Sequence, residues 1–380
     1  MKKLLIIDSV DLDFLTSRKD IALAAQEAGY EVTIITKDTG RGKNIEDLGL
    51  KFIALPIDLA GTNLITEFKT LFFLYRTYRR VKPDIIHHFG IKLVLWGGLA
   101  AKLAKSKGIV NTITGLGFLF SEENIQSFRT NLIISVLRYS HNRRNFEVIF
   151  QNLDDKKLFI DLGIIGEYQC EVIKGSGIDL DVFNFAPEPE DMKIKIVFIS
   201  RMIKDKGIFE IVDAANKLRS DYGKKIVFLF CGDIDKNPNA ISKDVLQKIC
   251  DGEYISWLGY RNDIKDILIN SHIFVLPSYY REGIPRSIIE ASAIGRPIIT
   301  TDSVGCKETV NDGYNGYLIP IKDSYALVES LLKLIHNKKL RKRFGMNSRK
   351  IAERDYSIKN VIDKHLKVYN QFSLSSGHDF

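Results

Sequence analysis

The stretch that decides the fold reads Ile273-Phe274-Val275-Leu276-Pro277-Ser278-Tyr279-Tyr280-Arg281-Glu282-Gly283-Ile284-Pro285-Arg286-Ser287-Ile288-Ile289-Glu290-Ala291. Its first four residues form a short apolar run, which predicts a buried strand. A glycine-containing loop follows, and Pro285 has a fixed φ that suits the first turn of a helix. The unpaired N–H groups at the start of such a helix suit an anion or a hydroxyl-rich ligand.

The same alternation of short β-branched runs and amphipathic stretches extends along the whole chain. Strands separated by helices of this length are βαβ units, which require parallel sheets with helices on both faces. We therefore predict an α/β protein with two Rossmann-like, doubly wound domains. The expected strands are 4–8, 31–36, 52–55, 84–88, 109–114 and 147–151 in the first half, and 195–200, 226–231, 254–257, 273–276, 297–300 and 317–319 in the second.

A chain of 380 residues is too long for one ordinary hydrophobic core. The periodicity breaks at Phe185-Ala186-Pro187-Glu188, where we place the domain boundary. The predicted domains are 1–184 and 185–355, followed by a helix at 356–372 that crosses back to the first domain. Ligands of such sheets bind at the carboxyl ends of the strands, so we expect the two domains to face a central cleft.

The composition is that of a soluble globular protein, with 45% hydrophobic and 27% charged residues. A formal charge of +8 favours an anionic partner, although a solvated basic surface explains it equally well. The scattered cysteines indicate a reducing compartment, and the apolar run after Met1 is too short for a signal peptide. The longest apolar stretch, around 93–101, is too short to span a bilayer, so we expect a cytoplasmic protein.

Two carboxylates lie within the deciding stretch. Glu282 falls on the predicted loop, and Glu290 falls about a turn and a half beyond Pro285. Carboxylates accept hydrogen bonds from neighbouring hydroxyl groups, so a sugar ring or a ribose is the natural partner. The alternative is a structural pair of capping and salt-bridging residues.

Two cations follow the first strand of the second half. Arg201 lies just beyond the strand at 195–200, and Lys206 lies close to the start of the next helix. An Arg fork and a Lys point charge together neutralise a diphosphate, and the stabilisation grows as the diphosphate becomes a leaving group. A solvated basic turn is the alternative. A diphosphate site and a diol site on neighbouring strand ends together describe a nucleotide-diphosphate sugar.

The Glu282-Gly283-Ile284-Pro285 loop, the interval to Glu290 and the Arg201/Lys206 pair resemble family 4 of the retaining glycosyltransferases. The likeness covers nearly the whole chain and is greatest to bacterial enzymes of polysaccharide and lipid-linked oligosaccharide synthesis. It implies the GT-B fold, no metal and no cofactor. It places Arg201 and Lys206 on the donor diphosphate, Glu282 beside the donor sugar and Glu290 on the ribose. Further binding residues that it implies are Gly283, Ile284, Pro285, Gly259, Arg261 and Gly117.

The resemblance implies an enzyme that moves a hexose or an N-acetylhexosamine from a UDP-sugar to a saccharide. The implied acceptor is linked to undecaprenyl diphosphate, in capsule, O-antigen or exopolysaccharide synthesis. Two alternatives stay open: an enzyme like the non-hydrolysing UDP-sugar epimerases of the same fold, and a non-catalytic sugar-nucleotide binding protein. No nucleic-acid partner is expected.

The first half departs from the family pattern. Many relatives carry a His in the stretch that corresponds to Asn111–Gly117, where this chain has Thr112 and Thr114. His88 could supply an imidazole, although a strand-end His is more often a structural hydrogen-bonding residue. We interpret Asp11 and Asp13 as a solvated acidic loop rather than a metal site.

A predicted helix at 64–81 carries aromatic residues beside basic ones, among them Phe68, Phe72 and Arg76. This pattern suits peripheral attachment to the anionic inner face of the cytoplasmic membrane. A core helix with a basic exposed face is the alternative. Further basic residues that we add to this side are Arg138, Arg143 and Arg144.

Overall fold

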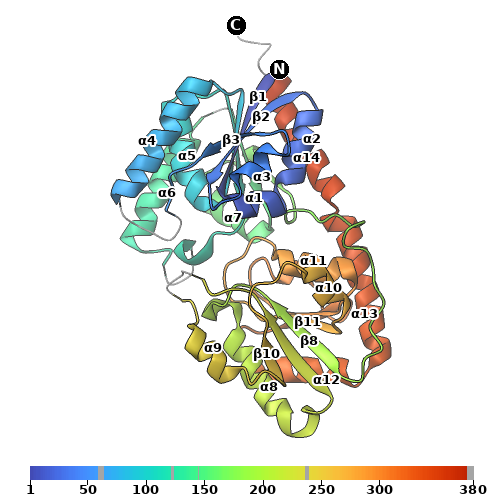
Figure 1. Cartoon of the computed structure of the whole chain (residues 1–380). Coiled ribbons are helices and arrows are strands. Elements are labelled where there is room, and N and C mark those ends of the chain that lie inside the picture. The colour runs from blue at the N-terminus through green and yellow to red at the C-terminus, as the bar shows by residue number, and fades with distance from the viewer. Residues whose placement is uncertain (59–63, 121–123, 144, 236–238, 375–380) are drawn as a thin grey trace. The chain divides into compact units, whose positions relative to one another are not determined.

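The computed structural model describes residues 1–58, 64–120, 124–143, 145–235 and 239–374, which divide into two compact units (Figure 1). Unit 1 is Met1–Gly177 with Ile358–Phe380, and unit 2 is Ile178–Ser357. The chain leaves unit 1 beside the point where it returns, because a Cβ on Gly177 would lie 3.0 Å from Cα of Ile358.

The segment 185–191, with which the second predicted domain begins, packs within unit 2. The backbone N–H of Ala186 donates to the carbonyl of Ile294 over 3.1 Å. Arg296 donates to the carbonyl of Pro187 over 3.2 Å. The prolines and acidic residues that break the periodicity therefore lie in a segment that packs against the rest of unit 2. The units divide slightly earlier in the sequence, between Gly177 and Ile178.

Unit 1 is built on a parallel sheet with the strand order β3-β2-β1-β4-β5-β6-β7. Alternate residues of β1 enter different cores, since Leu4 and Ile6 pack on one face and Leu5 and Ile7 on the other. Burial on both faces explains why such a strand reads as a continuous apolar run. The strands are β1 (Lys2–Val10), β2 (Tyr30–Lys37), β3 (Lys51–Ala54), β4 (Ile85–Phe89), β5 (Gly108–Ile113), β6 (Phe146–Phe150) and β7 (Cys170–Val172).

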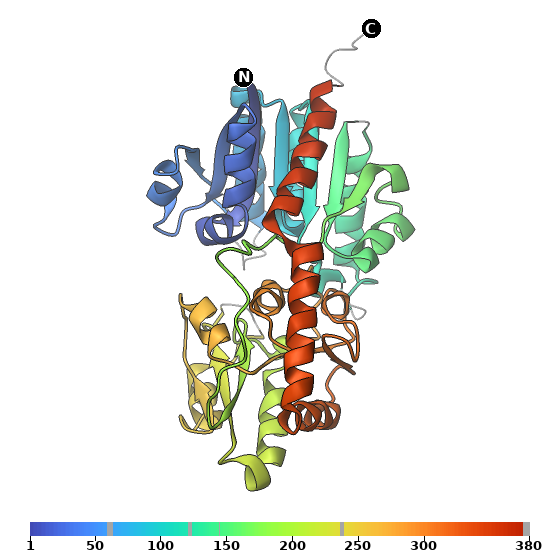
Figure 2. The same ribbon diagram turned by 90° about the vertical axis from the view of Figure 1, so that its right-hand side faces the viewer.

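Helices cover both faces of this sheet. One layer contains α4 (Leu64–Val81), α5 (Ile91–Leu103), α6 (Phe128–His141) and α7 (Leu153–Asp161). The other contains α1 (Asp11–Ser17), α2 (Lys19–Glu27), α3 (Gly42–Glu46) and the last helix, α14 (Ile358–Leu374). Figure 2 shows α14 running along the sheet of unit 1, where Val361, Val368 and Tyr369 join its core.

Unit 2 repeats the architecture on a parallel sheet with the order β10-β9-β8-β11-β12-β13. The chain winds outward in one direction from β8 to β10 and then in the other from β11 to β13, as in doubly wound folds. The strands are β8 (Ile194–Ile199), β9 (Ile226–Cys231), β10 (Ile255–Trp257), β11 (Ile273–Leu276), β12 (Ile298–Thr301) and β13 (Gly316–Ile319). The helices are α8 (Ile208–Tyr222), α9 (Lys243–Ile249), α10 (Ile264–Ile269), α11 (Arg286–Ile294), α12 (Ser324–Ile335) and α13 (Lys338–Ile351).

The expected solvated acidic loop after β1 is instead helix α1, which makes that prediction wrong. Asp11 is buried at its start and accepts hydrogen bonds from the backbone N–H groups of Thr39 (2.5 Å) and Arg41 (3.1 Å). Its carboxylate therefore ties α1 to the loop after β2. Among the described residues, no helix combines the length and apolar character needed to cross a membrane.

Candidate active site

The doubly wound order of unit 2 reverses between β8 and β11, which are hydrogen-bonded neighbours. Ligands of open α/β sheets bind outside the carboxyl ends of the strands at such a reversal. The loop after β8 carries Arg201 and Lys206, and the loop after β11 carries Glu282. The topology thus brings the predicted cations and the predicted carboxylate to one place.

The Nζ of Lys206 donates to Oε1 of Glu282, and only 8% and 13% of the two side chains are exposed. Ser278 Oγ also approaches the same carboxylate oxygen, at 3.3 Å. The ring of Tyr280 borders the pair, with its centroid 5.3 Å from the Lys206 ammonium. Because water is largely excluded here, a charge placed beside this pair interacts more strongly than it would at an open surface.

The backbone holds the two loops together independently of these charges. The carbonyl of Asp205 accepts from the N–H groups of Tyr279 (2.9 Å) and Tyr280 (3.1 Å). Gly207 adopts φ +82°, and a side chain there would collide with the carbonyl of Pro277. Lys206 is therefore placed against the β11 loop by main-chain contacts that do not depend on its own ion pair.

The loop after β12 also packs against the backbone at Glu282. Gly305 follows β12 with φ +82°, and a Cβ there would lie 2.7 Å from the Glu282 carbonyl oxygen and closer still to that of Gly283. Ser303 Oγ donates to the carbonyl of Ser278 over 2.8 Å. Three successive strand ends thus fix the position of the carboxylate.

Arg201 lies at the same edge with more of its side chain in solvent. Its Nη1 donates to Oδ2 of Asp235 over 2.5 Å, and 55% of its side chain is exposed. Burial raises the pKa of Tyr280, and the nearby Arg201 opposes that rise. Tyr280 therefore lies close to both cations. The contacts of Tyr280, Asp235 and Gly305 at this site could not be assigned from the sequence, although Tyr280 belongs to the deciding loop.

Helix α11 and the loop before it carry other residues that are predicted to bind the nucleotide sugar. Pro285 precedes the first helical residue rather than forming part of the first turn, and the side chain of Ile284 is buried in an apolar cluster that anchors the Gly283–Pro285 loop. On the helix, Arg286 Nε donates to Oε1 of Glu290 over 2.9 Å. Burial raises the pKa of Glu290, and Arg286 partly offsets that rise.

Gly259 and Arg261 follow β10, two strands from β8 in the sheet. Gly259 adopts φ +66°, and its carbonyl accepts from the N–H of Gly232 over 2.9 Å. Arg261 forms an exposed, two-pronged ion pair with Asp263. Both residues thus lie at the predicted edge, away from the Lys206 ion pair.

The candidates from the first half lie in unit 1. Gly117 begins a 3-10 turn after β5 with φ +58°. His88 is fully buried, and its Nε2 and Nδ1 lie 2.8 Å from Tyr78 Oη and 2.8 Å from Asn111 Oδ1. Both ring nitrogens are thus engaged inside the core, which fits the structural hydrogen-bonding alternative for His88 rather than an imidazole supplied to the sugar.

This core network continues beyond His88. Asn111 Nδ2 lies 2.9 Å from His141 Nε2, and His141 Nδ1 lies 2.8 Å from the carbonyl of Leu137. The Asn111 amide nitrogen can only donate, so His141 Nε2 must accept, and His141 is neutral with its proton on Nδ1. His88 Nδ1 donates to Asn111 Oδ1, and the Tyr78 hydroxyl can donate to a neutral His88 Nε2. Burial lowers the pKa of His88 and of His141 to about 4, in agreement with neutral rings.

Chemically, the unit 2 site offers two cations for a diphosphate and two carboxylates for hydroxyl groups. Each cation already has a carboxylate partner, Asp235 for Arg201 and Glu282 for Lys206. A bound diphosphate would share these cations with carboxylates that remain able to accept hydrogen bonds from a sugar. This combination of groups suits the transfer of a sugar from a nucleotide diphosphate.

Comparison with known families agrees with this chemistry. Residues 181–351 match the family described as glycosyl transferases group 1, and residues 3–152 match the family described as glycosyl transferase 4-like. Together the two matches span most of both units, so fold and site define a glycosyltransferase with the GT-B architecture. Residues 181–351 thus carry a group 1 glycosyltransferase domain, and residues 3–152 carry a glycosyl transferase 4-like domain.

Two bacterial relatives are similar over nearly their whole lengths. The N,N'-diacetylbacillosaminyl-diphospho-undecaprenol alpha-1,3-N-acetylgalactosaminyltransferase of Campylobacter jejuni is 29% identical, over 93% of this chain and 94% of the relative. The UDP-Gal:alpha-D-GlcNAc-diphosphoundecaprenol alpha-1,3-galactosyltransferase of Escherichia coli is 26% identical, over 90% and 89%. The crystal structure of Anabaena HepE with UDP and glucose shares the fold, with a TM-score of 0.78 at 17% identity over 98% of this chain and 100% of that one.

Proposed function

We propose that this glycosyltransferase retains the anomeric configuration and transfers a hexose or an N-acetylhexosamine from a UDP-sugar. The proposed acceptor is a saccharide on undecaprenyl diphosphate, in capsule, O-antigen or exopolysaccharide synthesis. The observation that carries the proposal is the Lys206–Glu282 pair beside Arg201 at the strand-order reversal of unit 2. The names of the two relatives support the lipid-linked acceptor.

In the proposed mechanism, Arg201 and Lys206 take up the negative charge that develops on the departing diphosphate. Preorganised groups of this kind are usually the largest single contribution to catalysis. The acceptor hydroxyl then bonds to the anomeric carbon from the face that the diphosphate leaves, through an oxocarbenium-like state. The bond from this carbon to the diphosphate oxygen breaks, and the hydroxyl proton passes to the departing diphosphate. Glu282 orients the sugar, Glu290 holds the ribose, and Gly259 and Arg261 flank the base. No metal or cofactor takes part in this proposal.

The test is a screen of UDP-sugars with the purified protein and a synthetic lipid-diphosphate saccharide. Transfer with release of UDP is the expected result. Conversion of the UDP-sugar without any acceptor would favour the epimerase-like alternative, and tight binding without turnover would favour a non-catalytic binding protein. Analysis of the new linkage distinguishes retention from inversion.

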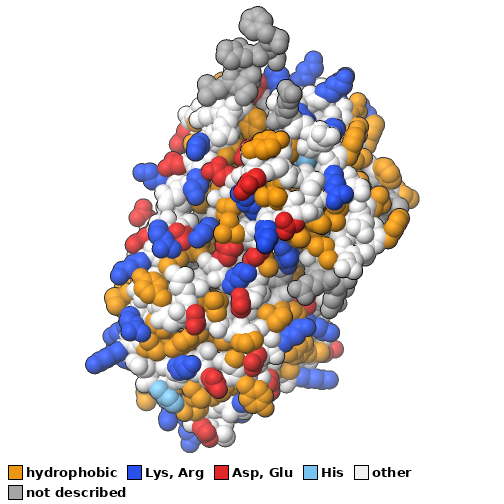
Figure 3. All heavy atoms as spheres, turned by 180° about the vertical axis from the view of Figure 1, so that it is seen from behind, with side chains coloured by type: hydrophobic (Ala, Val, Ile, Leu, Met, Phe, Trp, Pro, Cys, Tyr) orange, Lys and Arg blue, Asp and Glu red, His pale blue; other side chains and the backbone are white. Residues whose placement is uncertain are grey.

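We further propose that unit 1 attaches to an anionic membrane surface. Helix α4 exposes Ile65, Phe68 and Phe72 along one stripe, and α6 exposes Phe128, Leu132 and Tyr139 along another. Figure 3 shows hydrophobic side chains along the margin of unit 1 that carries α4. Helices α4 and α6 both pack against α5 in the same layer, and exposed aromatic stripes of this kind suit insertion at the headgroup boundary.

The predicted basic residues differ in whether they lie beside the exposed aromatic stripes of the proposed membrane surface. Arg76 lies over the ring of Phe72, 5.7 Å from its centroid, and so accompanies the stripe. Arg138 is instead engaged by the carbonyl of Leu162, to which its Nε donates over 2.8 Å. Arg144 lies outside the described residues. We therefore assign the proposed membrane contact to the aromatic stripes rather than to Arg138.

Flotation with phosphatidylglycerol vesicles at low salt tests the attachment. The Phe68→Ser/Phe72→Ser variant should lose most of its vesicle binding, whereas Tyr325→Ser, an exposed aromatic residue of unit 2, should bind as the parent does. Equal binding by all three proteins would contradict the proposed surface. The donor screen does not depend on this result, because it uses a soluble assay.

A further inference from the structure

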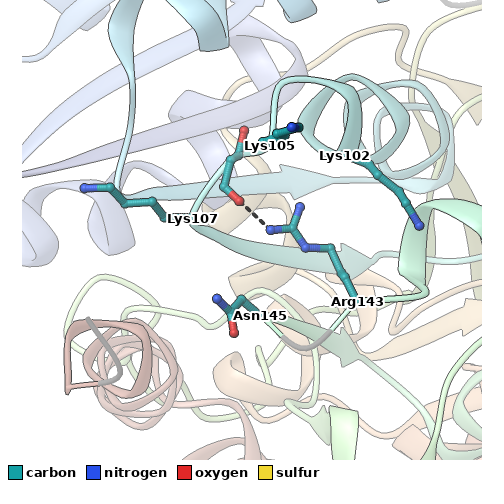
Figure 4. Close-up of a pocket in the computed structure, with 6 residues that line it drawn as sticks. Lys102, Lys105, Lys107, Arg143 and Asn145 are labelled. Carbon is teal, nitrogen blue, oxygen red and sulfur yellow. Dashed lines mark hydrogen bonds between the residues drawn. The ribbon is translucent and has the colours of Figure 1, made fainter. Parts of the chain in front are cut away.

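A pocket of about 480 Å³ lies in unit 1 at the amino-terminal edge of the sheet (Figure 4). Lys105, Ser106 and Lys107 line it from the segment before β5, and Arg143 and Asn145 line it from the segment before β6. Lys102, on the last turn of α5, completes the lining. Ligands of doubly wound sheets bind at the opposite, carboxyl edge, so this pocket is separate from the sugar-transfer chemistry.

The lining is strongly basic. Lys107 pairs with Asp84 over 2.7 Å, and it is the lining cation for which the described residues supply a carboxylate. Lys105 has no ion pair within the described ranges. Figure 4 shows the Arg143 guanidinium in the middle of the pocket, with Lys102 on one side, Lys107 on the other and Asn145 nearby. The pocket therefore carries excess positive charge.

Hydrogen bonds that cap helix ends explain only some of the cations that line the pocket. Lys102 Nζ donates to the carbonyl of Asn142 over 3.0 Å beyond the end of α6, which is a common role for a cation at a helix C-terminus. Arg143 Nη2 donates to the carbonyl of Ser106. That contact uses one of the five N–H groups of the guanidinium, and Lys105 makes no comparable contact within the described part of the chain.

The crowded cations affect one another. Burial lowers the pKa of Lys102, and the nearby charge of Arg143 lowers it further. Burial also lowers the pKa of Arg143. An anion in the pocket would oppose each of these effects, because an opposite charge stabilises the protonated form.

We propose that this pocket binds a phosphoryl group carried on a small organic molecule or on a lipid headgroup. A guanidinium fork matches the geometry of phosphate oxygens, and Lys105, Lys107 and the Asn145 amide provide further donors around it. A volume of about 480 Å³ is in the range of sites for small organic ligands. The proposal does not rest on the donor site, and it assigns a second anion-binding function to unit 1.

The test uses the full chain, saturated with UDP so that the unit 2 site is occupied, and titrated with glycerol 3-phosphate. Backbone amide NMR signals of Ser106, Lys107 and Asn145 should shift in a saturable manner. Lys105→Gln and Arg143→Gln should each weaken this binding about tenfold or more, the effect of losing one charge-assisted contact. Lys105→Gln is needed beside Arg143→Gln because Arg143 also supports the fold through its contact with Ser106.

Lys82→Gln is the matched control for Lys105→Gln. Both lysines follow a helix of unit 1 with positive φ, +50° for Lys82 and +54° for Lys105, but Lys82 does not line the pocket. Lys82→Gln should bind as the parent does. Malonate at the same concentrations serves as the carboxylate control and should bind at least tenfold more weakly than glycerol 3-phosphate.

Vesicles containing phosphatidylglycerol form the second arm of the test. Saturable shifts with soluble glycerol 3-phosphate support a metabolite as the source of the phosphoryl group. Flotation that depends on Lys105 and Arg143, but not on Lys82, supports a lipid headgroup. The proposal is overturned if neither arm shows binding that depends on Lys105 and Arg143, or if malonate binds equally well.

Discussion

Lys206 and Glu282, which are far apart in the sequence, form a buried ion pair between the loop after β8 and the loop after β11. Removing one partner of a buried pair typically costs about 3–5 kcal/mol, because the other charge stays buried and unpaired. Lys206 therefore has two roles, as a candidate diphosphate ligand and as the partner of the carboxylate. Variants that separate these roles are the most informative.

Arg201→Ala and Lys206→Ala should each lower turnover about 10²–10³-fold, the usual cost of removing one preorganised electrostatic contact. Lys206→Ala should also lower the melting temperature, whereas Arg201→Ala should not, because more than half of its side chain is exposed. Steady-state kinetics and thermal denaturation check this. Lys204→Ala, an exposed lysine of the same loop, is the control. Parent-like turnover in Arg201→Ala and Lys206→Ala would refute the assigned roles.

Gly305→Ala should reduce turnover although residue 305 carries no reactive group. The added Cβ would meet the carbonyls of Glu282 and Gly283, so the carboxylate loop must move. Gly313→Ala is a matched control, since Gly313 also has positive φ, +71°, but has nothing within 4 Å of an added Cβ. Similar kinetics for the two variants would mean that the position of Glu282 does not matter for activity.

Gly97→Ala and Gly98→Ala test the buried network of unit 1. Both residues lie on α5, where Gly→Ala normally stabilises a helix by up to about 1 kcal/mol. A Cβ on Gly97 would lie 3.2 Å from Cε1 of His88 and closer to Cδ2 and Nε2, whereas one on Gly98 would lie 3.6 Å from Ser140 Oγ. Chemical denaturation should find Gly97→Ala destabilised and Gly98→Ala unchanged or stabilised. A Gly97→Ala variant that is more stable than Gly98→Ala would contradict the close packing of α5 against His88.

Unit 1 should lose stability as the pH falls from 6.5 towards 4. His88 and His141 stay neutral in the folded state until the pH reaches about 4, whereas the unfolded chain takes up protons near the ordinary value of 6.5. The unfolded state thus binds more protons in this window, so acid favours it. When unfolding is measured at several pH values, the free energy of unfolding should change less steeply with pH in His88→Gln than in the parent. The expected reduction is about 1.4 kcal/mol per pH unit, which corresponds to one proton. An unchanged slope in His88→Gln would contradict a neutral imidazole in the core.

Glu290 should select ribonucleotides over deoxyribonucleotides. Loss of one hydrogen bond to a charged group costs about 1.5–3 kcal/mol, so 2′-deoxy-UDP should bind at least about tenfold more weakly than UDP. Glu290→Gln should reduce that ratio, as competitive displacement of a fluorescent nucleotide can measure. An unchanged ratio would remove Glu290 from the ribose site.

Much of the fold could be predicted from local sequence patterns. The strands at Ile226–Cys231 and Ile273–Leu276 and the helix at Leu64–Val81 have the predicted bounds, because short apolar runs mark the two strands and a long amphipathic stretch marks the helix. The helix at Asp11–Ser17 was missed, because its stability comes from hydrogen bonds between Asp11 and a loop that is distant in sequence. Such contacts leave no local periodicity.

The grouping of the candidate site residues could be predicted to a similar degree. Residue types and their strand-end positions indicated Arg201, Lys206 and Glu282, since strand order alone brings them together. The sequence could not show that Gly305 supports Glu282 or that Asp235 pairs with Arg201, because both are contacts between loops. The two roles of His88 could not be separated from the sequence for a related reason: its position at a strand end is visible there, but the Tyr78 and Asn111 partners that enclose it are not.

Calorimetric titration with UDP and with uridine tests the central claim most directly, because the two ligands differ only in the diphosphate. Two charge-assisted contacts of about 1.5–3 kcal/mol each predict that UDP binds at least about 100-fold more tightly than uridine. Arg201→Ala and Lys206→Ala should each reduce this ratio about tenfold or more. Equal affinities for UDP and uridine, or a ratio that neither variant changes, would contradict a diphosphate site formed by Arg201 and Lys206.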